Sequence, residues 1–233
     1  MKHLGIVIPA HNEASVIAST IKDVKSLSVK GFTKPEVIII NDGSSDNTSE
    51  IAKRSGATVL NHIIQLGAGG ATRTGLKYAL RNSQKDSVIV TMDADGQHHH
   101  QDVVKLINSL NKNKLDIVVG NRIQKGDSVM PWYRKLGNNY LTNLSRALFG
   151  IKVKDTQSGM RAYSRDALEK VVDYQSDRYA FCTEMLWLAK KSNLKVGETP
   201  ITVIYSDYSL AKGQSNWNAF NLILELLWIK ISR

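Results

Sequence analysis

The sequence predicts an α/β fold in which a mostly parallel, doubly wound sheet carries helices on both faces. Short apolar runs of strand length recur through the first 122 residues, and each is followed by a polar turn. Segments with apolar residues at helical spacing separate these runs. Parallel strands need a crossover connection, usually a helix, so this alternation indicates a parallel sheet.

The expected elements follow from these runs in chain order. The strands cover residues 4–8, 36–40, 58–60, 87–92, 116–120, 159–163 and 201–205. The helices cover residues 12–24, 48–55, 67–80, 103–110, 132–148, 181–191 and 217–231. Asn12 is expected to cap the first helix, because Asn is a favoured residue at that position.

Composition limits the classes of protein to consider. The 233 residues carry a formal net charge of +10, which indicates an anionic partner: nucleic acid, a phosphorylated substrate or an anionic membrane surface. Against nucleic acid, the chain has no zinc-knuckle spacing, no RNA-binding aromatic motif and only 7% aromatic residues. The single cysteine, Cys182, excludes an internal disulfide framework and suits a reducing compartment. We expect neither a signal peptide nor a membrane span.

The most informative stretch is the apolar run 88–92, which ends in Asp93 and Asp95 and then a glycine. Residues two apart in a strand share a face, so both carboxylates can converge at the carboxyl end of the strand. Ligands of open α/β sheets bind at that edge. Two carboxylates held close together disfavour each other's charge unless a cation lies between them. Mg²⁺ takes oxygen ligands and shares them with substrate phosphates, so the stretch predicts a metal–diphosphate site.

Further carboxylates follow other expected strands. Glu13, Asp42 and Asp155 each lie in a loop after a strand, and such loops emerge at one edge of a parallel sheet. Each residue alone could be an ordinary helix, turn or loop acid. Their repetition at equivalent strand ends favours a shared site. The glycine-rich segment 67–75 could offer backbone N–H groups to an anion, although it matches no complete phosphate-binding fingerprint.

These residues resemble the motifs of family-2 glycosyltransferases, and most closely those of the dolichyl-phosphate (polyprenyl-phosphate) mannose synthase branch. The motifs occur in the family's order at residues 9–13, 41–46, 67–69, 93–98, 120–122, 155–159 and 212–215. The resemblance covers nearly the whole chain. It implies a glycosyltransferase A-type, Rossmann-like fold, a nucleotide-sugar donor such as a GDP- or UDP-hexose, and Mg²⁺ or Mn²⁺.

The resemblance also implies roles for single residues, carried over by position. The substrate contacts on the donor side would come from Pro9, His11, Glu13, Asp42 and Gly69. Asp93 would face the ribose and diphosphate, and the metal ligands would be Asp93, Asp95 and Gln97. Phosphate groups would be met by Arg122, Arg134 and Lys212. The sugar site would be shaped by Asp155 and Ser158.

Four positions depart from the family's pattern. His11 stands where Tyr is frequent and keeps a flat ring for stacking. Asn41 replaces the first acid of an Asp-Asp-Gly triplet, which leaves Asp42 for recognition. Ala68 replaces a frequent Lys and removes one diphosphate contact. Lys212 stands where Arg is frequent and offers a point charge in place of a bidentate fork.

The chemistry of the reaction indicates which class of acceptor the enzyme would use. A leaving nucleoside diphosphate develops negative charge, which a metal and Lys or Arg can stabilise. A hydroxyl acceptor also needs a base. Related transferases that act on hydroxyls often carry Glu-Asp after a Thr, whereas here Thr183-Glu184 is followed by Met185. An ionised lipid phosphate needs no base, so the sequence favours a polyprenyl-phosphate acceptor. Asp155 and Glu184 remain candidate bases for the alternative.

Two amphipathic segments are candidates for contact with a membrane surface. The expected helix at 132–148 has an apolar stripe made of Trp132, Tyr133, Leu136, Tyr140, Leu141, Leu144 and Leu148. Such a helix could lie on a membrane surface or pack on its own domain. Segment 217–231 is interrupted by Glu225 and Lys230 and is too short to span, so it could be an interfacial anchor or a docking helix.

The histidines and the single cysteine also have reactive side chains. His98 is expected near the site, whereas His99 and His100 are expected to be surface loop residues. No role is expected for His62. Cys182 is expected to be a small core residue, since no pattern marks it as a nucleophile.

The sequence therefore predicts one glycosyltransferase domain over residues 1–233: a nucleotide-sugar-binding half (1–122), an acceptor-binding half (123–216) and a C-terminal amphipathic helix (217–233). The expected reaction is metal-dependent, inverting transfer of a hexose to an undecaprenyl- or dolichyl-type phosphate. It would occur in the cytoplasm, peripherally on the inner membrane face, with a separate membrane-protein partner as an option. The alternatives are transfer to a hydroxyl of a polysaccharide or glycolipid, and a non-catalytic nucleotide- or nucleic-acid-binding module.

Overall fold

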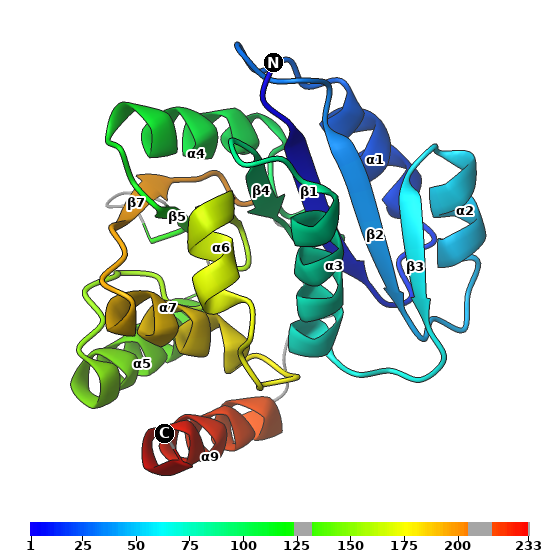
Figure 1. Cartoon of the computed structure of the whole chain (residues 1–233). Helices are drawn as coiled ribbons and strands as arrows, with labels where there is room; N and C mark the ends of the chain where they lie inside the picture. Colours follow the sequence, from blue (N-terminus) through cyan, green and yellow to red (C-terminus); the bar gives the residue numbers. More distant parts are fainter. Residues whose placement is uncertain (124–131, 205–215, 233) are drawn as a thin grey trace.

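The computed structural model describes residues 1–123, 132–204 and 216–232, with the side chains of 132–134, 216–220 and 232 left out. Within these residues the strands form a seven-stranded sheet of order β3-β2-β1-β4-β6-β5-β7 (Figure 1). The strands are β1 Leu4–Ala10, β2 Glu36–Asp42, β3 Thr58–His62, β4 Val88–Thr91, β5 Ile117–Asn121, β6 Arg161–Ser164 and β7 Val196–Pro200. Strand β6 runs antiparallel to β4 and β5, and the other pairs are parallel.

Helices cover both faces of the sheet, as the apolar pattern predicts. The helices are α1 Ile17–Lys25, α2 Thr48–Arg54, α3 Ala68–Asn82, α4 Gln101–Lys112, α5 Trp132–Phe149, α6 Arg165–Val171, α7 Phe181–Lys191 and α9 Asn216–Ser232. Successive strand residues point to opposite faces. In β2, Ile38 and Ile40 pack in one core with α3, α6 and α7, whereas Val37 and Ile39 pack in a second core with α1 and α4. The predicted fold class is confirmed.

The chain before α1 differs from the prediction. Asn12 adopts φ +55° and does not cap a helix, and α1 begins only after Val16. Asn tolerates this left-handed backbone better than most residues. Its side-chain Oδ1 instead accepts the N–H of Ser45 at 2.8 Å. The polar residue at this position therefore joins the loops after β1 and β2.

The sequence predicted the last strand of the sheet at residues 201–205, which is later in the chain than the strand that the structure shows. Residues 201–204 are not a strand; β7 is Val196–Pro200, and Tyr205 lies outside the described residues. The edge position of β7 explains its weak apolar signal, because one side of an edge strand pairs with no other strand. The apolar residue that suggested a strand, Ile201, is a buried core residue next to Gly120.

The expected apolar stripe of α5 is also wrong in part. Leu136 and Tyr140 are 63% and 57% exposed, while the helix turns polar residues inward. Among these, Asn138 donates to Asp155, and Ser145 bonds to Thr183. Because buried polar groups must be paired, these hydrogen bonds determine how the helix is rotated about its axis, and they outweigh the apolar pattern. The outward face of α5 is consequently left with apolar side chains.

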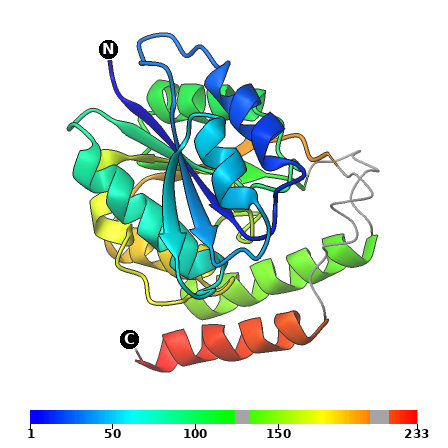
Figure 2. The same cartoon turned by 90° about the vertical axis from the view of Figure 1, so that its right-hand side faces the viewer.

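Helices α5 and α9 lie side by side beneath the sheet (Figure 2). Leu222, Leu226 and Ile229 of α9 are buried in the core on that side. Among the described helices, none combines the length and the apolar character that a membrane span requires.

Candidate active site

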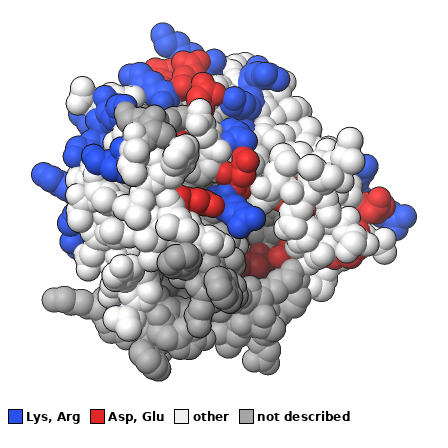
Figure 3. Space-filling view, turned by 90° about the horizontal axis from the view of Figure 1, so that it is seen from below, with Lys and Arg blue, Asp and Glu red and all other residues white. Residues whose placement is uncertain are grey.

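Strands β1, β2 and β3, which are parallel, end toward the lower edge of the molecule in Figure 1. Seen from below, this edge has a hollow with acidic side chains on its floor (Figure 3). Asp93 and Asp95 lie in the turn after β4, which ends at Thr91, so they follow the strand and are not part of it. The loops after β1 and β2 lie at the same edge because these strands run parallel to β4. The loop after β5 lies there too, because β4 and β5 both run antiparallel to β6 and so share one direction.

Asp93 is surrounded by groups that favour its charge. His98 Nε2 donates to its Oδ2 at 2.9 Å. Burial acts to raise the pKa of Asp93, but the His98 hydrogen bond and the charges of His98, Arg122 and Arg161 outweigh it, and the pKa lies below its ordinary value. The prediction that His98 lies near this acid is confirmed. Asp93 is therefore an ionised ligand candidate.

The pKa of Asp95 is shifted in the opposite direction. Burial and the charge of Asp93 raise its pKa to about 6, with a smaller contribution from Glu13, despite the hydrogen bond from the N–H of Gln97. Asp95 thus lies close enough to both Asp93 and Glu13 for their charges to raise its pKa. Such a carboxylate pair is stabilised by a cation.

The donor set fits Mg²⁺ or Mn²⁺ better than a metal that needs a complete protein cage. In the described part of the chain, no group of three or more His, Cys, Asp or Glu side chains could hold a metal. Mg²⁺ commonly takes one or two carboxylates and completes its shell with substrate phosphates and water. Asp93 and Asp95 match that requirement, with the amide oxygen of Gln97 as a further candidate.

The loops after β1 and β2 are joined by hydrogen bonds. His11 Nδ1 bonds to the carbonyl of Asp42 at 2.7 Å, and the backbone N–H of Glu13 donates to Thr48 Oγ1 at 2.8 Å. Pro9 and His11 remain partly exposed at this edge. These contacts bring together Pro9, His11 and Glu13, which the resemblance assigns to a nucleoside pocket.

The side chain of Asp42 has a different position from the one predicted. It is buried and accepts the N–H groups of Leu66 and Gly67 at 2.9 and 2.8 Å. His62, for which no role was expected, donates from Nδ1 to the same carboxylate at 2.7 Å and bonds to Thr74 through Nε2. Asp42 therefore holds the loop between β3 and α3. Only the pairing of Asp42 opposite His62 in the sheet reveals this contact.

Gly69 is explained by packing. A Cβ on this residue would lie 2.3 Å from the carbonyl oxygen of Ser176 and 2.7 Å from that of Arg178. The carbonyl of Gly69 also accepts a hydrogen bond from Tyr174 at 2.7 Å. The start of α3 is thus covered by segment 174–178, and close backbone approach, more than anion contact, requires glycine here.

Arg122 and Asp155 form a buried pair. Asp155 is fully buried and accepts from Arg122 Nε at 2.8 Å, from Arg122 Nη2 at 2.9 Å and from Asn138 at 3.0 Å. Burial raises the pKa of Asp155, but Arg122 and Asn138 together hold it below the ordinary value. This weak basicity disfavours Asp155 as a base. Of the other predicted phosphate ligands, Lys212 and the side chain of Arg134 lie outside the described residues.

Glu184 is a structural residue here, which corrects its candidacy as a base. Its side chain is buried, and its carboxylate accepts the N–H of Gln175 and both the N–H and the hydroxyl of Ser176 at 2.7 to 3.1 Å. It anchors the same segment that covers Gly69.

The segment 155–159 is organised by a residue that sequence reasoning missed. Arg161 is 1% exposed, and its guanidinium donates to the backbone carbonyls of Thr156, Ser158 and Cys182 at 2.8 to 2.9 Å. Ser158 is buried, and its hydroxyl has no hydrogen-bond partner among the described residues. Cys182 is the core residue expected, and burial raises its thiol pKa to about 11.

A model of glycosyl transferase family 2 matches residues 5–172. The chain belongs to this family. It is 35% identical to the UDP-N-acetylglucosamine–dolichyl-phosphate N-acetylglucosaminyltransferase of Methanococcus voltae, with 100% of this chain and 98% of that protein covered. It is 28% identical to the polyprenol monophosphomannose synthase of Mycolicibacterium smegmatis, with 89% and 79% covered.

The fold of this family-2 glycosyltransferase is the A-type fold implied by the motifs. It matches a crystal structure of glucosyl-3-phosphoglycerate synthase from Mycobacterium tuberculosis with a TM-score of 0.72 at 21% identity, covering 99% of this chain and 79% of that one. That structure contains Mn²⁺, UDP and glucosyl-3-phosphoglycerate. The enzyme class predicted for the chain is confirmed.

Proposed function

We propose that this glycosyltransferase transfers a hexose, or an N-acetylated hexose, from a nucleotide diphosphate sugar to a polyprenyl phosphate, with inversion at the anomeric carbon. The observation that carries the proposal is the pair Asp93 and Asp95 in the turn after β4, where burial and the charge of Asp93 raise the pKa of Asp95 to about 6. The acceptor class is supported by the two relatives named above, a dolichyl-phosphate N-acetylglucosaminyltransferase and a polyprenol monophosphomannose synthase. The name of the first supports a UDP-sugar donor.

Asp93, Asp95 and Gln97 would hold Mg²⁺ or Mn²⁺, which would neutralise the charge that develops on the leaving diphosphate. Glu13, Pro9 and His11 would position the nucleoside, since Pro9 lies near the end of β1 and the other two lie in the loop that follows it, with Glu13 near Asp95. Arg122, Arg134 and Lys212 would contribute positive charge toward phosphate groups. The division of the chain into a donor half (1–122), an acceptor half (123–216) and a C-terminal helix is part of this proposal.

Among the described residues, both candidate bases already have hydrogen-bond partners, which supports an ionised acceptor. Asp155 is paired with Arg122, and Glu184 holds segment 175–176. A hydroxyl acceptor would need a carboxylate that is able to take a proton. A polyprenyl phosphate is already ionised at neutral pH, so its oxygen can attack directly. Transfer to a hydroxyl is the second candidate, with lower support from these contacts.

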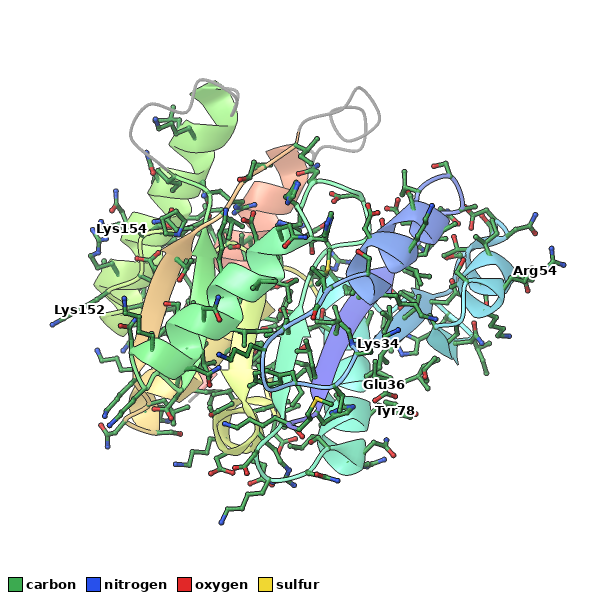
Figure 4. All side chains as sticks on the ribbon, turned by 90° about the horizontal axis from the view of Figure 1, so that it is seen from above. Lys34, Glu36, Arg54, Tyr78, Lys152 and Lys154 are labelled. Carbon is green, nitrogen blue, oxygen red and sulfur yellow. The ribbon has the colours of Figure 1, made fainter. Side chains whose placement is uncertain are left out.

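Cations of the described part of the chain project from more than one side of the molecule. In Figure 4, Lys152 and Lys154 project beside β7 while Arg54 projects from the opposite side of the molecule. Nucleic-acid-binding domains concentrate their cations on one face or along one helix. This dispersal favours the enzyme over a nucleic-acid-binding module.

We also propose peripheral binding to the inner face of the cytoplasmic membrane. Leu136 and Tyr140 of α5 are exposed, and α9 has an outward stripe at helical spacing. The α5/α9 surface comprises Leu136, Tyr140, Leu224, Leu227, Trp228 and Ile231, which are 39% to 80% exposed. Lys135 and Lys230 are exposed on the same helices. Apolar stripes with flanking cations suit an anionic lipid surface.

Calorimetry with UDP- and GDP-sugars, with and without Mn²⁺, tests the donor and the metal. The wild type is expected to bind one class of donor only with Mn²⁺, and Asp95→Ala is expected to lose this binding because the cation loses a carboxylate. Asp86→Ala is the matched control, since Asp86 is an exposed acid before the start of the same strand. Absence of donor binding in the wild type with any metal, together with tight, salt-dependent RNA binding, would overturn the enzyme proposal.

Co-sedimentation with phosphatidylglycerol vesicles that contain polyprenyl phosphate tests the membrane contact. Trp228→Glu combined with Ile231→Glu is expected to weaken binding about 10-fold or more, because two apolar side chains no longer enter the interface. The control adds the same charge at the opposite edge of the sheet, with Asn82→Glu and Gln84→Glu. Equal losses in the two double variants would show that charge alone matters and would refute the role of the α5/α9 surface.

A further inference from the structure

The imidazole of His98 is buried, with 2% of its side chain exposed, and its Nε2 donates to Asp93 Oδ2 at 2.9 Å. Its Nδ1 is also buried and has no hydrogen-bond partner within the described parts of the chain. A buried polar atom without a partner costs about 1–3 kcal/mol. An apolar side chain would fill this space at lower cost, so packing alone does not explain the histidine. Its contact with Asp93 does.

The position of His98 is set independently of Asp93. Its backbone forms an antiparallel bridge with Val203, and the N–H of Ile204 donates to the carbonyl of Gln97 at 2.8 Å. One residue earlier than Val203, the N–H of Thr202 donates to the buried carboxylate of Asp102 at 2.6 Å. The segment that follows β7 therefore holds the backbone of His98 in place, and the ring donates its hydrogen bond to the acid from that position.

Asp93 is confined on its other side by Gly159. A Cβ on Gly159 would lie 2.6 Å from Asp93 Oδ1. The carbonyl of Gly159 is fixed by Thr91 Oγ1 at 2.7 Å. The carboxylate thus has the Gly159 backbone on one side and the His98 N–H on the other. A carboxylate offers about four lone-pair sites, so one hydrogen bond orients it and leaves others for a cation.

We propose that His98 is a positioning residue that orients the Asp93 carboxylate so that Asp93 and Asp95 bind one divalent cation together. This inference rests on the proposed metal site. It assigns to His98 the hydrogen bond that fixes a ligand, and no contact with the cation itself. Hydrogen-bond partners of metal ligands typically contribute 10- to 100-fold to metal affinity.

The test measures Mn²⁺ binding to the protein without a sugar donor, both in the absence and in the presence of UDP or GDP. Binding is monitored as the loss of the electron paramagnetic resonance signal of free Mn²⁺. His98→Leu is expected to weaken Mn²⁺ binding about 10- to 100-fold. His98→Gln, whose amide N–H can replace Nε2–H, is expected to stay within about threefold of the wild type. His100→Leu is the matched control, because within the described residues the His100 side chain has a single polar contact, a 4.0 Å ion pair with Asp23.

A double-mutant cycle completes the test. In an Asp93→Ala background, His98→Leu is expected to have no further effect on Mn²⁺ affinity, because it acts through Asp93 alone. A further loss in that background, equal losses in His98→Leu and His98→Gln, or wild-type affinity in His98→Leu would each overturn the inference. Failure of the wild type itself to bind Mn²⁺ under either condition would instead overturn the proposed metal site. Circular dichroism and urea unfolding confirm that each variant is folded.

Discussion

Asp155→Ala is expected to lower the free energy of unfolding by about 3–5 kcal/mol, because it removes a buried carboxylate that accepts hydrogen bonds from Arg122 and Asn138. The carboxylate is fully buried and takes two side-chain bonds from Arg122 at 2.8 and 2.9 Å, together with the backbone N–H of Arg122 at 3.0 Å. Arg122 keeps 21% of its side chain exposed, which places the loss toward the lower end of that range. This loss in the free energy of unfolding is measured by urea unfolding of the purified wild type and variants.

The control is a double-mutant cycle with Arg122→Met. The double variant is expected to be less destabilised than the sum of the two single variants, since neither charge is then left unpaired. Additive losses, or a loss below about 1 kcal/mol for Asp155→Ala alone, would show that the pair contributes little.

The same pair predicts a pH dependence. Because the folded-state pKa of Asp155 lies below its ordinary value, the carboxylate stabilises the fold fully above that ordinary value, which is about 3.9. This contribution is lost as the pH falls through the lower folded-state pKa. The stability difference between wild type and Asp155→Ala should therefore be constant between about pH 5 and 8 and shrink below about pH 4.

Gly159→Ala is expected to reduce transfer activity about 100-fold or more while leaving the protein folded, since a displacement of about 1 Å in a reacting group can have that effect. The new Cβ would lie 2.6 and 3.0 Å from the two carboxylate oxygens of Asp93. The backbone cannot easily retreat, because Thr91 holds the carbonyl of Gly159 and Arg161 holds that of Ser158. Asp93 must therefore move.

Activity is measured as release of nucleoside diphosphate with polyprenyl phosphate as acceptor. Gly5→Ala in β1 is the matched control, because its Cβ would have ordinary contacts, with His3 nearest at 3.6 Å. Near-normal activity in Gly159→Ala would mean that the orientation of Asp93 does not limit the reaction. Equal losses of activity in both variants would point to a general effect of added volume in the sheet.

The sequence could predict those parts of the fold that depend on local pattern. Strand-length apolar runs such as 36–40 and the helix at 181–191 were located correctly, because side-chain periodicity and chain turns are encoded over a few neighbouring residues. The same logic placed Asp93, Asp95 and Glu13 at one edge, because parallel strands bring their carboxyl ends together. The ordered motifs indicated the family.

Contacts between residues distant in the sequence could not be predicted in this way. Asp42 resembles a substrate ligand in its motif, but its bonds to Leu66, Gly67 and His62 give it a structural position. The rotation of α5 followed from the bonds of Asn138, Thr142 and Ser145 to partners outside the helix, against the apolar pattern. The edge strand β7 carried too little apolar signal to be recognised.

The sequence by itself determined the fold class, the enzyme family and the position of the carboxylate pair after β4. Only the tertiary structure decided which polar residues near that pair are available and which are used to hold the fold. Asp155 and Glu184 are occupied by Arg122 and by segment 175–176, while Asp93 is held between His98 and Gly159. The physical reason is that a polar group must find a partner when it is buried, and that partner is chosen by the packing of the whole chain.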